Sequence, residues 1–390
     1  MTAMTTRYIN VEDYRSGARR TLPRSVFELV DSGAGDEITL RENRVVFEAV
    51  RLRPRALGDV SSCDIGTTVL GQAISMPVLL APCGYSRMVH REAEMATGRA
   101  AQEAGTVFCL STVTSFPLED VARASTGPKW FQLYPPADPD ECRKLVERAK
   151  AAGFKALCVT IDGATLGLRE RDKRNGLTVP MRITPKLLAE GAVRPRWAWD
   201  FVRGGVGRGG QGLAGSKSMS IVRAGEAVAS VARSVTSKDI EFIREIWDGA
   251  LLIKGVQRGD EIDELVNLGV DAVIVSNHGG RQLDGVPGAI EILPEVVARA
   301  GGRIEVLIDS GFRRGTDIVK ALALGASAVL IGRPYLYGLA VNGQAGVEDV
   351  LRLLASEIRQ TMLLLGYPTI DSIDAAAVST PATSTQSPHR

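Results

Sequence analysis

Residues 272–333, AVIVSNHGGRQLDGVPGAIEILPEVVARAGGRIEVLIDSGFRRGTDIVKALALGASAVLIGR, alternate between short apolar runs and longer amphipathic stretches. The apolar runs are Ala272–Asn277, Glu305–Ser310 and Ala328–Arg333, and Thr316–Leu324 is an amphipathic stretch that ends before a glycine. This alternation is typical of βα units with a parallel sheet. The runs are continuously apolar, so both faces of each strand must be covered. The segment therefore predicts three parallel strands separated by helices.

Five earlier runs have the same character: Met76–Pro82, Thr106–Thr112, Lys129–Tyr134, Ala156–Asp162 and Leu251–Val256. Amphipathic stretches such as Asp138–Ala152 and Asp260–Leu268 lie between runs and also end before glycines, which is a helix stop signal. Eight parallel strands with helices between them predict an α/β fold, a closed eight-stranded parallel (β/α) TIM barrel over residues 76–375.

The remaining segments are assigned from their spacing and composition. The long gap between the fourth and fifth runs predicts an insertion at residues 170–238, whose glycine- and serine-rich middle is typical of a mobile loop. Residues 1–75 are predicted to form a helical cap on the barrel. The polar residues 376–390 are predicted to form a disordered tail.

Composition excludes several classes of protein. Of 390 residues, 45% are hydrophobic and 24% charged, which is ordinary for a globular enzyme, and a net charge of +2 disfavours nucleic acid as a partner. The five cysteines are scattered without zinc-site spacing, so no metal site is expected and a cytoplasmic location fits best. No secretory signal or membrane-spanning run is apparent.

Polar residues follow the sixth run, where the loops of a parallel barrel build the active site. His278 and Arg281 lie three residues apart in SNHGGRQ; an imidazole can take a proton, and a guanidinium matches a carboxylate. A lone histidine is more often a hydrogen-bonded structural residue. Here the other two histidines lie away from strand ends, which favours His278 as a base acting on an anionic substrate.

Glycine and arginine together follow the seventh and eighth runs, in DSGFRRG (309–315) and IGR (331–333). Tight turns and helix N-termini at this corner of a barrel bind phosphate, although solvated arginines would give the same pattern. Lys254 lies inside the apolar run LLIKGV, where its ammonium needs a partner unless it reaches the barrel rim. Further polar groups at strand ends suggest a pocket wall: Ser111, Gln132, Tyr134, Thr160 and Asp162.

Nearly the whole chain resembles the FMN-dependent 2-hydroxy acid oxidase and dehydrogenase family. The motif SNHGGRQLDG (276–285) is highly specific for that family, and DSGFRRG and WFQLY resemble its mandelate and lactate dehydrogenases. The resemblance implies that a 2-hydroxy acid is oxidised to the 2-oxo acid, with His278 as the base and two electrons passing to flavin N5. It also implies dioxygen or a quinone or other carrier as the acceptor, and a homotetramer.

The resemblance further implies roles for individual residues. Asp162 would hold the protonated imidazole, Arg281 and Arg169 would meet the substrate carboxylate, and Tyr134 would hydrogen-bond the substrate. Lys254 would face the N1–C2=O edge of the flavin. The other residues implied to bind FMN are Pro82, Cys83, Gly84, Ser111, Gln132, Tyr134, Thr160, Ser276, Asp309, Ser310, Gly311, Phe312, Arg313, Gly332 and Arg333, the last few around its phosphate.

One departure from the family pattern concerns the substrate. Leu29 stands where the family has a tyrosine that donates to the substrate carboxylate, which predicts weaker carboxylate binding by about 1.5–3 kcal/mol unless another group substitutes. Val113 and the small Gly84 predict a roomy, apolar pocket. These residues favour a bulky (aromatic or long-chain) (S)-2-hydroxy acid. The alternatives are a flavin enzyme whose substrate has no free carboxylate, and a non-catalytic binder of a phosphate ligand.

The insertion carries a second prediction. Residues 181–208 combine six basic residues with interleaved tryptophans, the composition of a segment that seeks membrane surfaces, and related family members attach to membranes there. An active-site lid packed on the barrel is an equally good interpretation. The enzyme is accordingly expected in the cytoplasm, with peripheral contact to the inner face of the cell membrane as an option.

Overall fold

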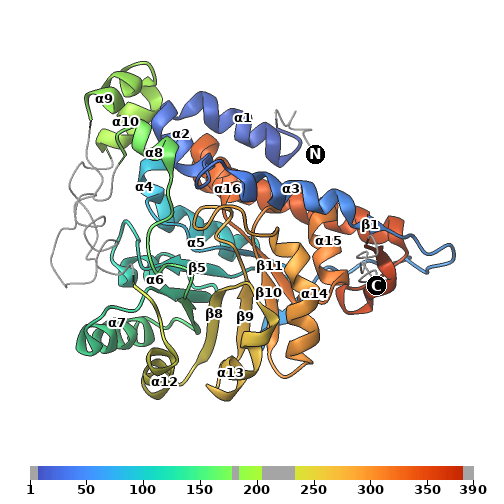
Figure 1. The fold of residues 1–390 in the computed structure, drawn as a ribbon. Helices are drawn as coiled ribbons and strands as arrows, with labels where there is room; N and C mark the ends of the chain where they lie inside the picture. Colours follow the sequence, from blue (N-terminus) through green and yellow to red (C-terminus); the bar gives the residue numbers. More distant parts are fainter. Residues whose placement is uncertain (1–7, 178–183, 204–232, 381–390) are drawn as a thin grey trace, which may run out of the picture.

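The computed structural model describes residues 8–177, 184–203 and 233–380. Eight parallel strands close into a barrel, which confirms the predicted TIM barrel (Figure 1). In chain order they are β4 (Val78–Leu80), β5 (Phe108–Ser111), β6 (Lys129–Leu133), β7 (Ala156–Thr160), β8 (Ala250–Val256), β9 (Ala272–Val275), β10 (Glu305–Ile308) and β11 (Ala328–Ile331). The barrel closes where β11 pairs with β4, with Val329 opposite Val78.

A helix follows each strand and covers the outside of the barrel. The covering helices are α5 (Ala93–Glu103), α6 (Leu118–Ala124), α7 (Pro139–Ala151), α12 (Ser237–Ile246), α13 (Ile262–Asn267), α14 (Ala289–Ala300), α15 (Gly315–Ala323) and α16 (Arg333–Leu365). Local sequence fixes several helix starts: Asp138 caps α7 by accepting from the Asp140 N–H, and Pro139 occupies its first position. Thr236 and Asp239 form a capping box at α12.

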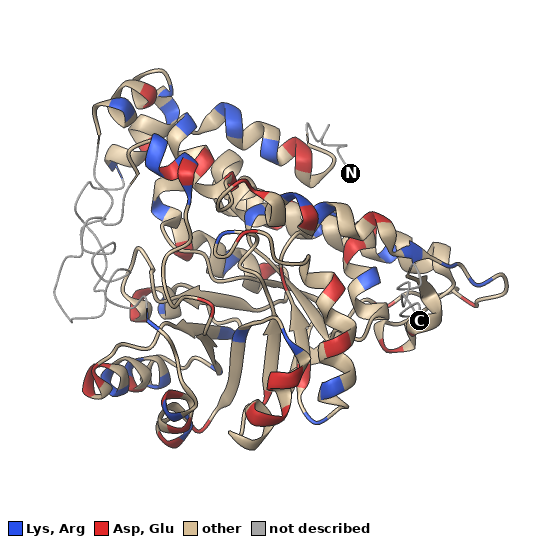
Figure 2. Ribbon diagram, in the orientation of Figure 1, with Lys and Arg blue, Asp and Glu red and all other residues tan. Residues whose placement is uncertain are grey.

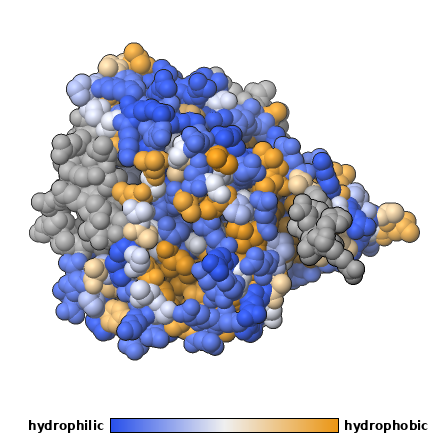
Figure 3. Space-filling model, in the orientation of Figure 1, coloured by the Kyte–Doolittle hydropathy of each residue, from blue (hydrophilic) through white to orange (hydrophobic). Residues whose placement is uncertain are grey.

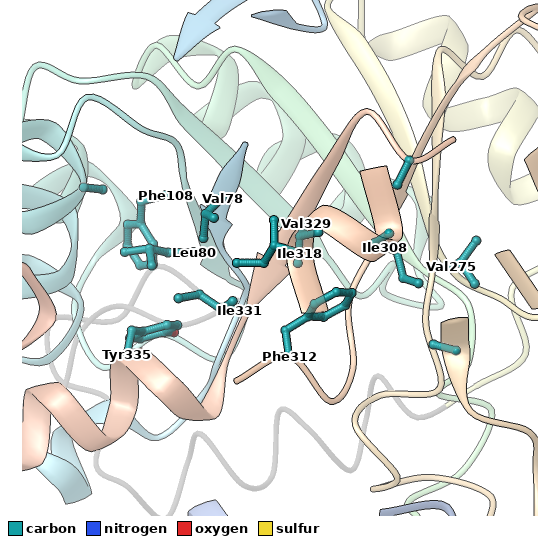
Figure 4. Close-up of a cluster of buried hydrophobic side chains, with 14 of the residues drawn as sticks. Val78, Leu80, Phe108, Val275, Ile308, Phe312, Ile318, Val329, Ile331 and Tyr335 are labelled. Carbon is teal, nitrogen blue, oxygen red and sulfur yellow. The ribbon is translucent and has the colours of Figure 1, made fainter. Parts of the chain in front are cut away.

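Two apolar layers explain why the strands are continuously hydrophobic. Successive side chains along each strand point alternately into the barrel and out of it. Leu79, Trp130 and Leu330 belong to the cluster inside the barrel. Figure 4 shows the outward set, in which Val78, Phe108 and other side chains pack against the helices. Both strand faces are therefore buried, as a parallel barrel requires.

The N-terminal segment forms helices across one end of the barrel, together with short strands that were not predicted. The helices are α1 (Val11–Thr21), α2 (Arg24–Asp31) and α3 (Ile38–Ala49), and α1 packs against α16 (Figure 1). A hairpin of β2 (Thr67–Val69) and β3 (Gln72–Ile74) places Val69 and Ile74 in the inner apolar cluster.

The predicted disordered tail begins too early. Residues Ala375–Ala377 form a short helix, η3, and β12 (Val378–Ser379) pairs antiparallel with β1 (Arg51–Leu52). Ala377 is fully buried, so these residues belong to the fold. A 3-10 turn, η2 (Ile370–Ser372), precedes them, and another, η1 (Gly259–Glu261), precedes α13. Residues 381–390 lie outside the described residues.

The insertion after β7 contributes three helices before α12: α8 (Glu170–Arg174), α9 (Pro185–Ala192) and α10 (Pro195–Arg203). Helices α8 and α9 both contact α2, so the insertion and the N-terminal helices lie at the same end of the molecule (Figure 1). Within the described residues, no helix is long and apolar enough to cross a membrane. Positions of Lys and Arg, in blue, are interspersed with positions of Asp and Glu, in red, along the ribbon, in keeping with the small net charge (Figure 2).

Candidate active site

One cavity opens where the carboxyl ends of the strands meet the helices of the N-terminal segment. Most of the predicted site residues line it: Leu29, Pro82, Cys83, Gly84, Ser111, Val113, Tyr134, Arg169, Lys254, His278, Arg281, Asp309, Ser310, Gly311, Phe312, Arg313, Gly332 and Arg333. The structure does not place Asp162, Gln132, Thr160 and Ser276 in the lining. Each of these four bonds directly to a neighbouring strand-end residue, so they form a supporting layer.

His278 is held by a carboxylate. Its Nδ1 lies 3.0 Å and 3.1 Å from the two carboxylate oxygens of Asp162. Burial raises the pKa of Asp162, but the charge and hydrogen bond of His278, together with the charge of Lys254, lower it below its ordinary value. Asp162 therefore stays ionised and accepts a hydrogen bond from the Nδ1–H of His278. The other ring nitrogen, Nε2, is left to exchange a proton.

The backbone around Asp162 and His278 needs glycine at particular positions. His278 has a positive φ of 58°, and Gly279 and Gly280 continue the left-handed turn. A side chain at Gly255 would place its Cβ 2.8 Å from the Cβ of Asp162. The glycines of SNHGG and of LLIKGV are thus needed to bring the imidazole and the carboxylate together.

Lys254 is a buried cation with two partners. Its Nζ lies 2.9 Å from Asp309 Oδ2 and donates to Ser276 Oγ at 2.7 Å. Burial lowers the pKa of Lys254, but the charges of Asp309 and Asp162 raise it above its ordinary value. The ammonium therefore remains charged, and it provides a fixed positive charge in the cavity wall.

The amide of Gln132 joins three strands. Its Oε1 accepts from Ser111 Oγ at 3.1 Å, and its Nε2 donates to Thr160 Oγ1 at 3.0 Å. Because β5, β6 and β7 are adjacent in the barrel, these groups form one continuous polar edge.

Four guanidiniums at the cavity form no ion pair with a carboxylate among the described residues, and one of them is Arg169, which donates to Arg281 O. Arg281 donates to Ser32 O, Arg313 to Phe312 O, and Arg333 to the carbonyls of residues 30, 32 and 279. Burial, followed by the positive charges of Arg169 and Arg333, lowers the pKa of Arg281 to about 9. Burial also lowers the pKa of Arg313. Like charges gathered without counterions indicate a site for an anionic ligand.

The chemistry of this donor set fits a phosphorylated flavin. Gly311 has a φ of 91°, and a Cβ there would lie 1.9 Å from Asn43 O, so the turn beside Arg313 needs glycine. A tight turn with positive φ exposes backbone N–H groups to a phosphate. The polar edge and the Lys254 ammonium offer the hydrogen bonds and charge that an isoalloxazine ring needs.

Apolar side chains also line the cavity. Leu29 of α2, Val89 of α4 (Ser86–Val89), Val113 and Leu166 line it. A Cβ at Gly84 would lie 3.0 Å from the Cβ of Val113, so glycine keeps this wall open. The sequence analysis did not identify Leu166 or Tyr85 as lining residues. Tyr85 directly follows Gly84, so extending the strand-end analysis by one residue would have found it.

The insertion helices pack on the cap rather than on the cavity. Trp197 is buried, donates from Nε1 to Met88 O at 2.8 Å and stacks on Phe201. Trp199 instead is 61% exposed, and Leu188, Val193 and Val202 are similarly exposed. Neither α9 nor α10 lines the cavity. Of the predicted membrane segment, residues 181–183 and 204–208 lie outside the described residues.

Comparison with known proteins agrees with this geometry. Residues 18–380 match the family described as FMN-dependent dehydrogenase. An L-lactate oxidase from Nostoc sp. is 44% identical over 374 residues, covering 94% of this chain and 97% of the relative. An (S)-mandelate dehydrogenase from Pseudomonas putida is 40% identical over 370 residues, covering 95% of this chain and 93% of the relative.

Solved structures show the same similarity. The crystal structure of the monotopic membrane protein (S)-mandelate dehydrogenase matches with a TM-score of 0.90 and 40% identity, covering 96% of this chain and 100% of that one. The family and structural matches span both the barrel and the strand-end motifs. The chain therefore belongs to the FMN-dependent dehydrogenase family, and its cofactor is FMN.

Proposed function

We propose that this enzyme oxidises a bulky, apolar (S)-2-hydroxy acid to the 2-oxo acid. The observation that carries the proposal is the Asp162–His278 pair at a cavity whose arginines lack carboxylate partners. His278 would take the proton from the substrate hydroxyl at Nε2, while Asp162 stabilises the imidazolium. FMN, when bound, would accept the two electrons that the substrate carbon loses together with its hydrogen.

The cofactor would occupy the strand ends. Lys254 would face its N1–C2=O edge and stabilise the negative charge of the reduced flavin there, and Asp309 would accept from the ribityl hydroxyls. Arg313 and Arg333, with the glycine turns beside them, would bind the phosphate. The ring would lie along the remaining predicted residues: Pro82, Cys83, Gly84, Ser111, Gln132, Tyr134, Thr160 and Ser276.

The substrate would lie between the cofactor and the cap. Arg281 and Arg169 would bind the carboxylate, because both residues line the cavity with His278 and the positive charge of Arg169 acts on Arg281. Burial, followed by the charge of Asp162, raises the pKa of Tyr134, so its hydroxyl stays protonated and can donate to a substrate oxygen. Leu29, Val113 and Gly84 would accept the apolar side chain. Relatives named for mandelate support a substrate of this size.

The test is anaerobic mixing of the FMN-loaded enzyme with glycolate, L-lactate, (S)-mandelate and longer 2-hydroxy acids. We expect bleaching of the flavin absorbance to be faster with mandelate and long-chain acids than with glycolate. If glycolate is oxidised fastest, the assignment of a bulky substrate is wrong.

A second candidate follows from Leu29. Its side chain lies in the cavity and cannot donate to a carboxylate, so a substrate without a free carboxylate, such as an amide or amine, fits this wall equally well. The same panel supplemented with 2-hydroxy amides would distinguish the two. Bleaching by the amides alone would favour the second candidate.

Peripheral membrane attachment through α9 and α10 is a further part of the proposal. Basic residues Lys186, Arg194, Arg196 and Arg203 accompany the exposed apolar side chains, and Figure 3 shows hydrophobic areas within a mostly hydrophilic surface at this end. A relative with the same fold is titled a monotopic membrane protein. Vesicles with anionic lipids should sediment the enzyme, but not the Trp199→Ser, Val202→Ser double variant. Leu57→Ser, at a 99% exposed site, is the matched control and should sediment like the wild type.

A further inference from the structure

Tyr85 lies at the turn between β4 and α4 and lines the cavity. Its backbone is left-handed, with φ 58° and ψ 22°, which is unfavourable for a residue with a side chain. Two other non-glycine residues with positive φ, His278 and Ser310, also line the cavity. Unfavourable backbone geometry concentrates where side chains must be aimed at a ligand. Tyr85 therefore shares a feature with the proposed base.

The hydroxyl of Tyr85 is buried without a hydrogen-bond partner among the described residues. Burial raises the pKa of Tyr85 to about 12, although the positive charge of Arg169 opposes the rise. The hydroxyl is therefore protonated at neutral pH, and its donor is unused. Buried polar groups without partners are rare because each forfeits the hydrogen bond it had with water.

The surroundings indicate what the missing partner is. Tyr85 is the N-cap residue of α4, which packs against α2. Leu29 of α2 lines the same cavity, and its side chain has no hydrogen-bond donor. The charge that acts on Tyr85 most strongly is that of Arg169, a guanidinium that donates only to the Arg281 carbonyl among the described residues. An unused hydroxyl and a guanidinium without an ion-pair partner in the same cavity lining form a site for an acceptor oxygen.

We propose that the Tyr85 hydroxyl donates a hydrogen bond to an acceptor oxygen of the bound substrate, at the end of the cavity that Leu29 and Arg169 line. The acceptor is a carboxylate oxygen or an amide carbonyl oxygen, which present the same lone pairs. The inference rests on the proposed function, since it takes this cavity to be the substrate site. It makes Tyr85 a specificity-determining residue in the position where Leu29 offers no donor.

The test compares holoenzyme variants with three probes: (S)-mandelate, its amide, and phenylglyoxylate as the non-reacting oxo acid. Binding is read from perturbation of the flavin spectrum under anaerobic conditions. Tyr85→Phe removes only the hydroxyl and should raise the Kd for phenylglyoxylate about 10- to 100-fold if a carboxylate accepts the bond. An effect confined to the amide would identify the carbonyl as the acceptor.

Tyr14→Phe is the matched control. Its hydroxyl donates to Asp349 at 3.0 Å, between α1 and α16 and away from the cavity lining, so its loss should leave every Kd unchanged. Equal Kd values for wild type and Tyr85→Phe with all three probes would overturn the proposal, and the hydroxyl would then serve an ordered water. If no probe binds the wild-type holoenzyme, the proposed function itself is wrong and this inference falls with it.

Discussion

The two ends of the cavity differ in how their polar groups are paired. At the proposed cofactor end, the strand-end groups beside the ring position bond to one another: Lys254 contacts Ser276 and Asp309, and Gln132 joins Ser111 to Thr160. The proposed phosphate-binding residues Arg313 and Arg333 have no carboxylate partner among the described residues. At the substrate end, the groups come from loops and the cap. There Arg281 forms no ion pair with a described carboxylate, and the Tyr85 hydroxyl has no partner among the described residues.

The difference indicates two ways of preparing a binding site. Charges that pair with one another are stable before the ligand arrives, and they hold their geometry. Charges without partners raise the free energy of the empty site, and a ligand of opposite charge releases that cost on binding. The cofactor end should therefore contribute to folding stability, whereas the substrate end should contribute to ligand affinity.

Replacing Lys254 by Met should produce the largest effect. It leaves the Asp309 carboxylate buried without its cation, which should cost about 3–5 kcal/mol in the free energy of unfolding, measured by urea titration of the apoprotein. The Lys254→Met, Asp309→Asn double variant should recover part of that loss. If Lys254→Met is as stable as the wild type, the Lys254–Asp309 pair does not contribute to folding stability.

Replacing Arg281 by Met should weaken ligand binding without lowering the stability of the protein. Because the guanidinium has no carboxylate partner and repels Arg169 and Arg333, its removal should leave the free energy of unfolding unchanged or slightly higher. The Kd for phenylglyoxylate should rise about 10- to 100-fold. Loss of stability comparable to that of Lys254→Met would remove the distinction between the two ends.

The Asp162–His278 pair predicts the smallest effect, a pH-dependent one. The pKa of Asp162 in the folded protein lies below its unfolded value of about 3.9, so ionised Asp162 stabilises the fold above that pH. This contribution disappears as the pH falls through the folded pKa. Urea titrations of wild type and Asp162→Asn should therefore differ at pH 7, and the difference should shrink as the pH falls below about 3.9. A difference that grows on acidification would mean that the folded pKa is raised.

The sequence predicted the barrel correctly, and it brought most of the proposed cofactor residues to one edge of it, for a shared physical reason. Continuous apolar runs identify buried parallel strands, and the residue after each run must lie at the common carboxyl edge. Lys254 and Asp309 could thus be brought together from strands far apart in the chain. The position of Tyr85 at the cavity follows from the same argument extended by one residue, but the unused donor of its hydroxyl does not, because it depends on a left-handed turn and on which atoms lack partners. Neither feature has a periodicity in sequence.

The segments that were predicted wrongly or incompletely depend on packing. The tail from residue 376 consists mostly of small and polar residues, yet the small apolar Ala377 is buried and β12 pairs with β1. Trp197 and Trp199 lie two residues apart in α10, but one donates to Met88 O and the other is exposed. Composition treats these residues alike, and only their tertiary contacts separate them.

The most direct test of the account is anaerobic mixing of FMN-loaded wild type and His278→Ala with (S)-mandelate. We predict that the wild type bleaches its flavin and that His278→Ala retains FMN but reacts about 10²- to 10⁴-fold more slowly, the range for loss of a general base. Equal rates in the two proteins would contradict the assignment of His278 as the base.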